Sequence, residues 1–171
     1  MFLKHALRIR DYHSNDLHAV VALFGAAVHT LAATHYDAAQ RQAWAPEQAD
    51  LPAWQARLAG LQTRVAEHNG RLAGFIAYTP EGHIDLLYCA PDHARQGVAG
   101  ALYRAAQASL ETAGVQRLFT KASLTARPFF ERQDFRVEQL QRVFRGAVAL
   151  QRFAMNKELQ SAGAASKSAH E

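Results

Sequence analysis

Apolar residues recur at helical spacing between residues 14 and 31, which predicts one buried face of a long α-helix. The residues of this stripe are Leu17, Val20, Val21, Phe24, Val28 and Leu31. Ser14 stands before the stripe as the expected helix N-cap, and Leu7–Arg10 is expected to form a short first strand. A loop or broken helix is then expected over Ala33–Pro46, and a further short helix over Leu51–Leu61.

The pattern next changes to the alternation of β-strands. Thr63–His68 and Arg71–Thr79 flank Asn69-Gly70, the dipeptide most typical of a tight hairpin turn. Glu81-Gly82 forms a second turn that leads into a strand beginning at His83. Three consecutive antiparallel strands are therefore expected.

The second half of the chain mixes helices with strands. The expected elements are a helix over Gly97–Ala113 ended by Gly114, a strand over Gln116–Lys121, a helix over Thr125–Arg132, and strands around Gln139–Phe144 and Val148–Met155. Hairpins combined with a strand-helix-strand crossover predict an α+β (α/β) fold, with a mixed, mainly antiparallel central sheet of about six to seven strands flanked by helices. Residues 1–159 are expected to form a single domain, and residues 160–171 a disordered tail.

Composition narrows the function classes. The 171 residues are 49% hydrophobic, enough for the core of one domain. The formal net charge of +4 suits an anionic ligand, but the basic residues are scattered, so nucleic acid is not an expected partner. The single cysteine excludes an internal disulfide, and no HExxH or paired Cys/His spacing suggests a metal site. No leading apolar stretch of signal or membrane-spanning length is evident, so a cytoplasmic location without membrane association is expected.

Small residues mark the start of the helix that follows the strand from His83. Gly97-Val98-Ala99-Gly100 lies where this helix begins, so several backbone N–H groups there lack helical partners and the helix dipole adds positive potential. Such a helix start suits a phosphate or pyrophosphate. The spacing matches neither GxGxxG nor the Walker motif, and a turn of small residues is equally typical of close packing.

A second sequence block favours the anion site over mere close packing. It reads Ser123-Leu-Thr-Ala-Arg-Pro-Phe-Phe-Glu-Arg-Gln-Asp-Phe135. Together the two blocks resemble motifs of the GCN5-related N-acetyltransferase (GNAT) superfamily, and the resemblance covers residues 5–157. Ala94-Arg95-Gln96-Gly97-Val98-Ala99 resembles that family's pyrophosphate loop, Gln/Arg-x-x-Gly-x-Gly/Ala. The second block is similar to the family's Asn-x-x-Ala-x-x-Phe-Tyr-Glu-Lys-x-Gly-Phe helix, and more so to a bacterial subgroup with Thr-Ala-Arg/Lys-Pro-Phe-Phe-Glu-Arg.

The resemblance implies direct transfer of an acetyl group from acetyl-CoA, as cosubstrate, to a primary amine of a small molecule or a protein. It also implies that the strands Ile84–Ala90 and Gln116–Lys121 separate, with the pantetheine arm bound to backbone groups in the gap. An N–H of Leu87 or Tyr88 would then support the thioester oxygen. The cofactor-binding residues implied are Leu87, Tyr88, Cys89, Arg95, Gln96, Gly97, Val98, Ala99, Gly100, Ala101, Ser123, Ala126, Phe129, Phe130 and Arg132.

Three positions depart from the family pattern. Ala94 replaces the usual Gln or Arg, which removes one contact to the pyrophosphate. Ser123 replaces Asn but keeps a donor and an acceptor. Phe130 stands where many members carry a Tyr that protonates the CoA thiolate. This last departure supports the alternative function, a CoA-binding regulatory or interaction module without transfer activity.

An alkylamine with a pKa of about 10.4 reaches the enzyme protonated, so a base is required. Asp85 is the first candidate, because Ala-Glu-Ile-Val-Phe-Cys-Ala of the histone-acetylating branch resembles Ile84–Ala90. His83, two residues away and hence on the same strand face, is the alternative base. Tyr88 is expected on the opposite face, as a core ring or a proton donor. Asp85 and His83 could equally be ordinary solvated or hydrogen-bonded strand residues, and Cys89 is expected to be buried packing.

The acceptor side of the resembled fold is built from the first helices. The candidate acceptor-binding residues there are His29, His35, Tyr36, Asp37 and Trp44. Asp37 could pair with an ammonium group, and an aromatic ring could add a cation–π contact. The alternative is a surface loop with one buried Trp. The expected partners are acetyl-CoA and an amine acceptor, and the protein is expected to be a monomer or a homodimer.

Overall fold

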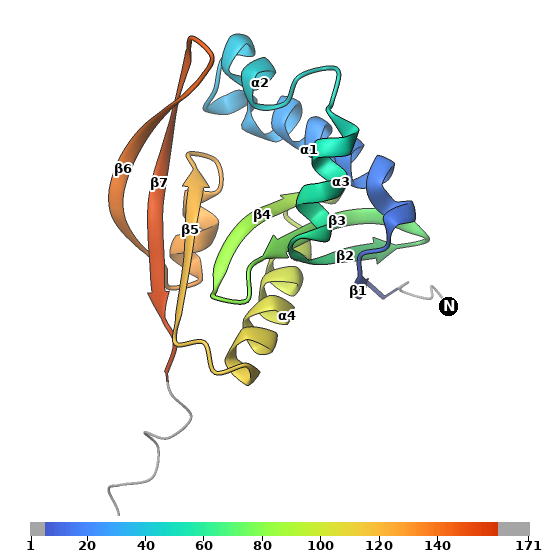
Figure 1. Ribbon diagram of the computed structural model, residues 1–171, viewed down its shortest axis with the longest axis vertical. Helices are drawn as coiled ribbons and strands as arrows, with labels where there is room; N and C mark the ends of the chain where they lie inside the picture. The colour runs from blue at the N-terminus through green and yellow to red at the C-terminus, as the bar shows by residue number, and fades with distance from the viewer. Residues whose placement is uncertain (1–5, 161–171) are drawn as a thin grey trace, which may run out of the picture.

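The computed structural model describes residues 6–160, so the predicted tail lies outside the described residues beyond Gln160. Its centre is one seven-stranded sheet with the order β1-β2-β3-β4-β5-β7-β6 (Figure 1). The strands are β1 (Arg8–Asp11), β2 (Gln62–His68), β3 (Arg71–Tyr78), β4 (His83–Cys89), β5 (Arg117–Ser123), β6 (Arg136–Arg145) and β7 (Val148–Glu158). Every neighbouring pair is antiparallel except β4–β5, which confirms the mixed, mainly antiparallel sheet.

Helices cover both faces of the sheet. They are α1 (Leu17–Leu31), α2 (Ala38–Trp44), α3 (Leu51–Ala59), α4 (Val98–Thr112) and α5 (Arg127–Arg132), with 3₁₀ turns η1 (Ser14–Asp16), η2 (Ala32–Thr34) and η3 (Pro91–His93). Figure 1 shows α4 on the opposite face from α1 and α3. Each face has its own hydrophobic core, which we call the α4-side core and the α1-side core.

Most local predictions hold because they depend on neighbouring residues. Asn69 and Gly70 have φ values of 54° and 73°, both in the left-handed region that a type I′ hairpin turn requires. Residues 33–46 form the expected broken helix, as η2 followed by α2. Strands β6 and β7 are longer than predicted, since polar residues alternate with apolar ones beyond the apolar stretches.

The predicted N-cap at Ser14 is wrong. A 3₁₀ turn precedes α1, and the carboxylate of Asp16 accepts the backbone N–H of His13 at 2.8 Å. The same carboxylate pairs with Arg10 at 2.8 Å. Asp16, and not Ser14, therefore supplies the side-chain acceptor for a backbone N–H at the entry to this helical segment.

The stretch Ser14–Thr34 has the length and mean hydropathy, 1.6, of a membrane-crossing helix, contrary to the expectation that no such stretch is present. Here α1 buries Leu17, Val20, Phe24 and Val28 in the α1-side core. This packing accounts for the apolar composition, which by itself is weak evidence for a membrane span.

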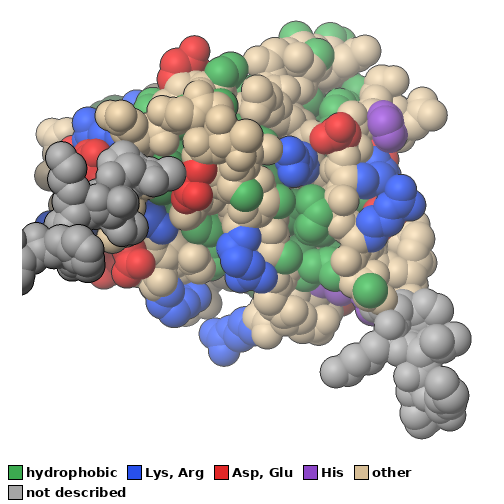
Figure 2. All heavy atoms as spheres, turned by 90° about the horizontal axis from the view of Figure 1, so that it is seen from below, with side chains coloured by type: hydrophobic (Ala, Val, Ile, Leu, Met, Phe, Trp, Pro, Cys, Tyr) green, Lys and Arg blue, Asp and Glu red, His purple; other side chains and the backbone are tan. Residues whose placement is uncertain are grey.

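Charged side chains are mixed on the surface. In the face shown in Figure 2, Lys and Arg lie between Asp and Glu side chains and do not gather in one patch. A continuous basic surface of the kind that binds a phosphate backbone is not seen on this face.

Candidate active site

Strands β4 and β5 are joined at only one end. They pair through His83 with Phe119 and through Ile84 with Thr120. At this end Oγ1 of Thr120 donates to the carbonyl of Ile84 at 2.8 Å. Within residues 6–160 no later residues of the two strands pair, and Figure 1 shows the strands diverging. The gap expected between them is therefore present.

A β-bulge lies in β4 where the divergence begins. Ala77 of β3 pairs with Leu86, whereas the next residue, Tyr78, pairs with Ile84. Asp85 is thus an extra residue between two paired ones. The extra residue shifts the alternation of the side chains that follow it, so Asp85 and Leu86 both face the α1 side.

The bulge changes the faces that follow it. Ile84 and Leu87 both pack against the α4-side core although they are an odd number of residues apart, and Tyr88 packs in the α1-side core. Tyr88 therefore lies on the face opposite Leu87, but the prediction that it lies opposite Asp85 is wrong, because the bulge brings both side chains to the cavity. His83 and Asp85 share the cavity face as predicted, with Ile84 between them on the α4 side, and the bulge shifts the alternation only after Asp85.

Backbone groups of β4 point into the gap. The N–H of Ala90 donates to Ala73 of β3 at 2.8 Å. Since amides alternate in direction along a strand, the N–H of Tyr88 also points to β3, while those of Leu87 and Cys89 point toward β5. Leu87, not Tyr88, is the residue whose N–H faces the gap.

The start of α4 is an open cradle. Gly97 adopts φ 84° as the N-cap, and the first helical hydrogen bond runs from Ala101 N–H to Gly97 O at 3.0 Å. The N–H groups before it have no acceptor within the helix; they belong to Val98, Ala99 and Gly100. Apart from its neighbours in the chain, no atom of residues 6–160 lies within 4 Å of the position that a Cβ would take at Gly97. This opening and its amides fit a pyrophosphate group.

The residues before this cradle are exposed. Arg95 has φ 60°, and Gln96 donates from Nε2 to the carbonyl of Asp92 at 3.2 Å. Cys89 lies near the cradle, where burial raises the pKa of its thiol to about 11 and the backbone N–H of Ala99 acts in the opposite direction. A thiol held neutral agrees with packing and not with a nucleophile.

A cavity of about 680 Å³ lies on the α1 side of the gap. It is bordered by α1, the α2–α3 segment, β4, β5 and the β6–β7 hairpin. The sequence-predicted residues that line it are His29, Tyr36, Trp44, His83, Asp85, Leu87, Tyr88, Ser123, Ala126 and Phe130. The remaining predicted residues lie elsewhere: His35, Asp37, Cys89, Phe129, Arg132 and the α4 cradle from Arg95 to Ala101.

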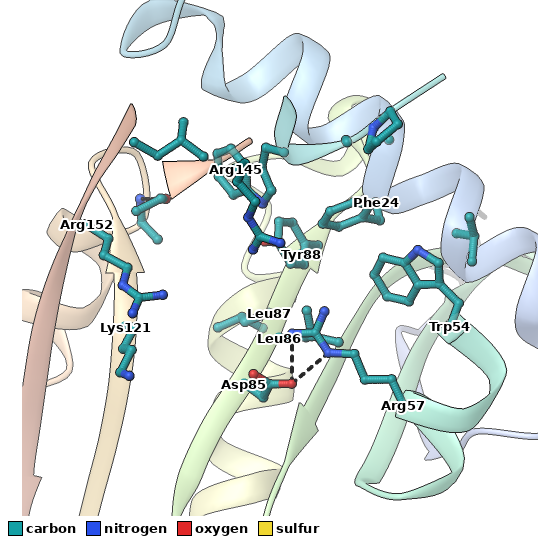
Figure 3. Close-up of a pocket in the computed structure, with 18 of the residues that line it drawn as sticks. Phe24, Trp54, Arg57, Asp85, Leu86, Leu87, Tyr88, Lys121, Arg145 and Arg152 are labelled. Carbon is teal, nitrogen blue, oxygen red and sulfur yellow. Dashed lines mark hydrogen bonds and ion pairs between the residues drawn. The ribbon is translucent and has the colours of Figure 1, made fainter. Parts of the chain in front are cut away.

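Asp85 points into this cavity and is held by Arg57 of α3 (Figure 3). Nε and Nη2 of Arg57 both bind Oδ2 of Asp85, at 3.0 and 2.9 Å. Within the described residues Oδ1 has no hydrogen-bond partner, so this oxygen is available to a substrate or a water. Arg57 in turn lies 5.7 Å from the ring centre of Trp54.

His83 is half-buried at the joined end of the gap. Its ring stacks parallel to Phe119 with centres 4.9 Å apart. Burial lowers the pKa of His83 below its ordinary value of 6.5, and the Asp85 carboxylate only partly opposes this. His83 is therefore neutral at pH 7 and able to accept a proton.

Tyr88 closes the cavity from the α1 side. Its ring contacts Phe24 edge-on at 4.9 Å and stacks on Phe75 at 5.7 Å. Burial raises the pKa of Tyr88 well above its ordinary value, although a hydrogen bond with Trp44 acts in the opposite direction. The hydroxyl keeps its proton throughout the physiological pH range.

Tyr36 is a buried structural anchor. Its hydroxyl donates to Gln151 O at 2.7 Å and accepts the N–H of Leu124 at 2.9 Å. Burial raises its pKa. Because both contacts hold the hydroxyl in place, Tyr36 fixes the β7 wall and is not free to donate a proton.

The other predicted acceptor residues have local structural contacts. Asp37 caps α2 in a reciprocal pair with Gln40: Gln40 N–H donates to Asp37 Oδ1 at 2.8 Å, and Asp37 N–H to Gln40 Oε1 at 2.9 Å. His35 contacts Thr125 Oγ1 at 3.0 Å, outside the cavity. Asp37 and His35 are therefore left out of the acceptor site. His29 stays at its edge, with Nε2 2.8 Å from Ala45 O.

Residues of the second sequence block lie across the gap from β4. Ser123 Oγ accepts the N–H of Ala126 at 3.0 Å and so fixes the turn into α5. Phe130 lines the cavity and is buried. Phe129 packs edge-on against Tyr103 at 6.1 Å, which places it in the α4-side core.

Several lining residues were missed by sequence reasoning. They are Phe24, Trp54, Arg57, Lys121, Arg145 and Arg152. Trp54 and Arg57 are three residues apart on one helix, which was a usable signal for a shared face. No local sequence pattern marked Lys121, Arg145 and Arg152 as cavity residues, because only the pairing of β5, β6 and β7 brings them to the same wall. Within residues 6–160 no cluster of three or more His, Cys, Asp or Glu could hold a metal ion.

A family model described as an acetyltransferase (GNAT) domain matches residues 32–159. The uncharacterized N-acetyltransferase YafP of Escherichia coli (strain K12) is 39% identical over 137 residues, covering 80% of this chain and 86% of that protein.

Two solved structures share the fold. A GCN5-related N-acetyltransferase (aminotransferase, class-II) from Rhodopseudomonas palustris superposes with a TM-score of 0.87 at 29% identity, over 93% of this chain and 99% of that one. The PaiA N-acetyltransferase of Thermoplasma acidophilum, in complex with coenzyme A, has a TM-score of 0.75 at 16% identity, over 90% of this chain and 99% of that one.

Proposed function

Because this chain belongs to the GNAT acetyltransferase family, we propose that it transfers the acetyl group of acetyl-CoA directly to a primary amine. The observation that carries this proposal is the gap between β4 and β5. It opens at the end of β4 that precedes the α4 cradle, and the cavity lies on its α1 side. The coenzyme A in the PaiA complex, a protein of the same fold, supports a CoA site.

The chain's own groups fit each part of the cosubstrate. The amides of Val98, Ala99 and Gly100 bind the pyrophosphate, and the N–H groups of Leu87 and Cys89 face the pantetheine arm. Acetyl-CoA supplies an activated acetyl thioester. The Leu87 N–H donates to the thioester oxygen, and a fixed donor at a developing oxyanion contributes roughly 3 kcal/mol in related chemistry.

Proton transfer is assigned to residues of the cavity. The free Oδ1 of Asp85 removes the acceptor proton, through a water because the Asp side chain is short, while Arg57 fixes the carboxylate. His83 is the alternative base, since its lowered pKa keeps it neutral at pH 7. With Phe130 in place of a Tyr, the protonated hydroxyl of Tyr88 is the donor toward the departing thiolate.

The test is thiol release from acetyl-CoA across a panel of primary amines and lysine peptides, with calorimetric CoA binding on the same preparation. We expect CoA binding, and release that depends on the acceptor. Binding without release from any acceptor would favour a CoA-binding module, and absence of CoA binding would overturn the proposed function.

A further inference from the structure

One wall of the cavity is built by positive side chains. Lys121 of β5, Arg145 of β6 and Arg152 of β7 line it; Figure 3 shows Lys121 and Arg152 across the cavity from Asp85 and Arg57, and Arg145 above Asp85. Strand pairing explains why these cations share a face.

The pairing can be followed residue by residue. Ser123 and Gln141 both pair with Arg152, and directly paired residues lie on the same face of a sheet. Lys121 is two residues from Ser123, and Arg145 is four residues from Gln141. Since side chains of a strand alternate, all three cations stand on the cavity face.

These cations have no carboxylate partner. Within residues 6–160 no Asp or Glu oxygen lies within 4.0 Å of their charged nitrogens. Arg152 bonds only the neutral Gln141, from Nε at 3.0 Å, and burial and Arg145 lower its pKa. Like charges that line one cavity without a carboxylate partner, with Arg145 acting on Arg152, are typical of a site that binds an anion.

The acidic groups that border the cavity do not supply that anion. Asp85 is paired with Arg57. Asp50 caps α3 by accepting the N–H of Ala53 at 3.0 Å. Glu47 is exposed in the α2–α3 segment.

We propose that the acceptor is a small amine that also carries an anionic group, a carboxylate or a phosphate, bound by Arg145, Arg152 and Lys121. This inference rests on the proposed function. The amine end lies toward Asp85 and the rings of Phe24 and Trp54, and the anionic end toward the cation wall. Guanidinium groups bind both anions through paired hydrogen bonds. The volume of about 680 Å³ is that of a small-molecule site.

The kinetic test compares amine acceptors that differ only at the anion. Glycine, β-alanine, 4-aminobutyrate and 5-aminopentanoate are assayed against their primary amides, and 2-aminoethylphosphonate against ethanolamine. We expect kcat/KM for the best anionic acceptor to exceed that of its neutral analogue by about tenfold or more. Comparing 2-aminoethylphosphonate with the amino carboxylates shows whether the site prefers a phosphate-like group or a carboxylate.

The double variant Arg145→Gln, Arg152→Gln should remove this preference and leave the KM for acetyl-CoA within about twofold. The matched control is Arg142→Gln, which makes the same single charge change on β6 as Arg145→Gln; Arg142 lies outside the cavity and stacks 5.2 Å from the ring centre of Phe144. Arg145 is exposed, so Arg145→Gln alone serves if the double variant does not fold.

A binding test works without an identified acceptor. The chain has two tryptophans, Trp44 and Trp54, and both line the cavity. With CoA at saturation and constant ionic strength, glutarate or 2-aminoethylphosphonate should change their fluorescence saturably, and glutaramide should not. The response should be lost in the double variant and kept in Arg142→Gln.

The proposal of an anionic acceptor would be overturned if the neutral analogues bind and react as well as the acids. It would also be overturned if Arg142→Gln loses the preference for the anion as fully as the double variant. Failure of acetyl-CoA to bind or to release thiol would overturn the proposed function instead. The fluorescence titration, repeated without CoA so that it reports on the cavity alone, separates the two results.

Discussion

Asp85 and His83 acquire their chemistry from their surroundings. Asp85 faces the α1 side of the sheet, where its carboxylate meets Arg57 of α3. His83 stays in the paired part of β4, where burial favours the neutral ring and lowers its pKa. At the residue scale, an ion pair with Arg57 fixes the carboxylate of Asp85, whereas burial keeps the ring of His83 neutral in the same cavity.

Replacing Asp85 should test the base directly. Asp85→Asn keeps the side-chain shape but removes the proton acceptor, so kcat/KM should fall about a hundredfold, and His83→Gln should change it less than about threefold. The measurement is the pH–rate profile of both variants between about pH 5 and 9.

The reverse result would assign the base to His83. A lowered pKa means that the ring stays neutral down to a pH below 6.5 and takes up a proton only as the pH falls further. Activity that depends on His83 would therefore be constant near pH 7 and lost at lower pH, and this acid limb would vanish in His83→Gln.

At the scale of elements, α4 connects the sheet to the phosphate end of the site. The helix lies close to β3 because Gly74 has no side chain: a Cβ there would stand 2.8 Å from Tyr88 O and 2.8 Å from Cγ1 of Val98. This close approach sets the position of the amides at the α4 cradle, and Gly97 leaves the cradle open.

A charge placed at the cradle should weaken cosubstrate binding. Gly97→Asp sets a carboxylate beside the phosphate position, whereas Gly97→Asn adds a side chain of the same shape without charge. Both residues tolerate the left-handed backbone at this position better than other non-glycine residues. We expect the Kd for CoA to be roughly tenfold higher for Asp than for Asn, measured by calorimetry at low salt. Equal Kd values would show that the phosphates bind elsewhere.

Adding a methyl group at the contact between β3 and α4 should destabilise the protein. Gly74→Ala is expected to lower the free energy of unfolding by about 1–3 kcal/mol, because the new Cβ meets backbone and buried side chains. The matched control is Gly25→Ala in α1, where the described residues outside its own helical turn place no atom within 4 Å of the new Cβ; it should stabilise by roughly 0.5–1 kcal/mol. Urea unfolding of both variants measures the difference, and an unchanged Gly74→Ala would contradict the close approach.

At the scale of the whole molecule, two parts of one sheet meet at a short seam. Strands β1 to β4 and strands β5 to β7 are joined through only two residue pairs of β4 and β5. The α4-side core spans this seam, with side chains of both parts of the sheet and of α4, including Ile76, Leu102, Leu118 and Met155. A cosubstrate bound in the gap would contact both parts at once.

CoA should therefore raise the thermal stability of the chain. At a free concentration of about 100 times its Kd, a ligand that binds only the folded state adds roughly 2.7 kcal/mol, which corresponds to a Tm increase of about 5–10 °C for a protein of this size. Thermal unfolding followed by circular dichroism measures this shift. Gly97→Asp at the same CoA concentration should show a smaller one, and no shift in the wild type would exclude binding to the folded gap.

Local sequence determined much of this protein. The apolar stripe of α1, the Asn69-Gly70 hairpin and the small residues that open α4 are each encoded by residues within a few positions of one another. Such patterns fix periodicity and turn geometry directly. The two motif blocks added the family resemblance, and with it the gap between β4 and β5.

Tertiary structure decided the chemistry of the cavity. The bulge at Asp85 depends on the register between β3 and β4, the Arg57 contact on the packing of α3, and the cation wall on three strands that meet only in the sheet. Asp37, a plausible ammonium partner by composition, instead caps its own helix. Contacts between residues far apart in the chain arise from register and packing of whole elements, and no local pattern of residues records them.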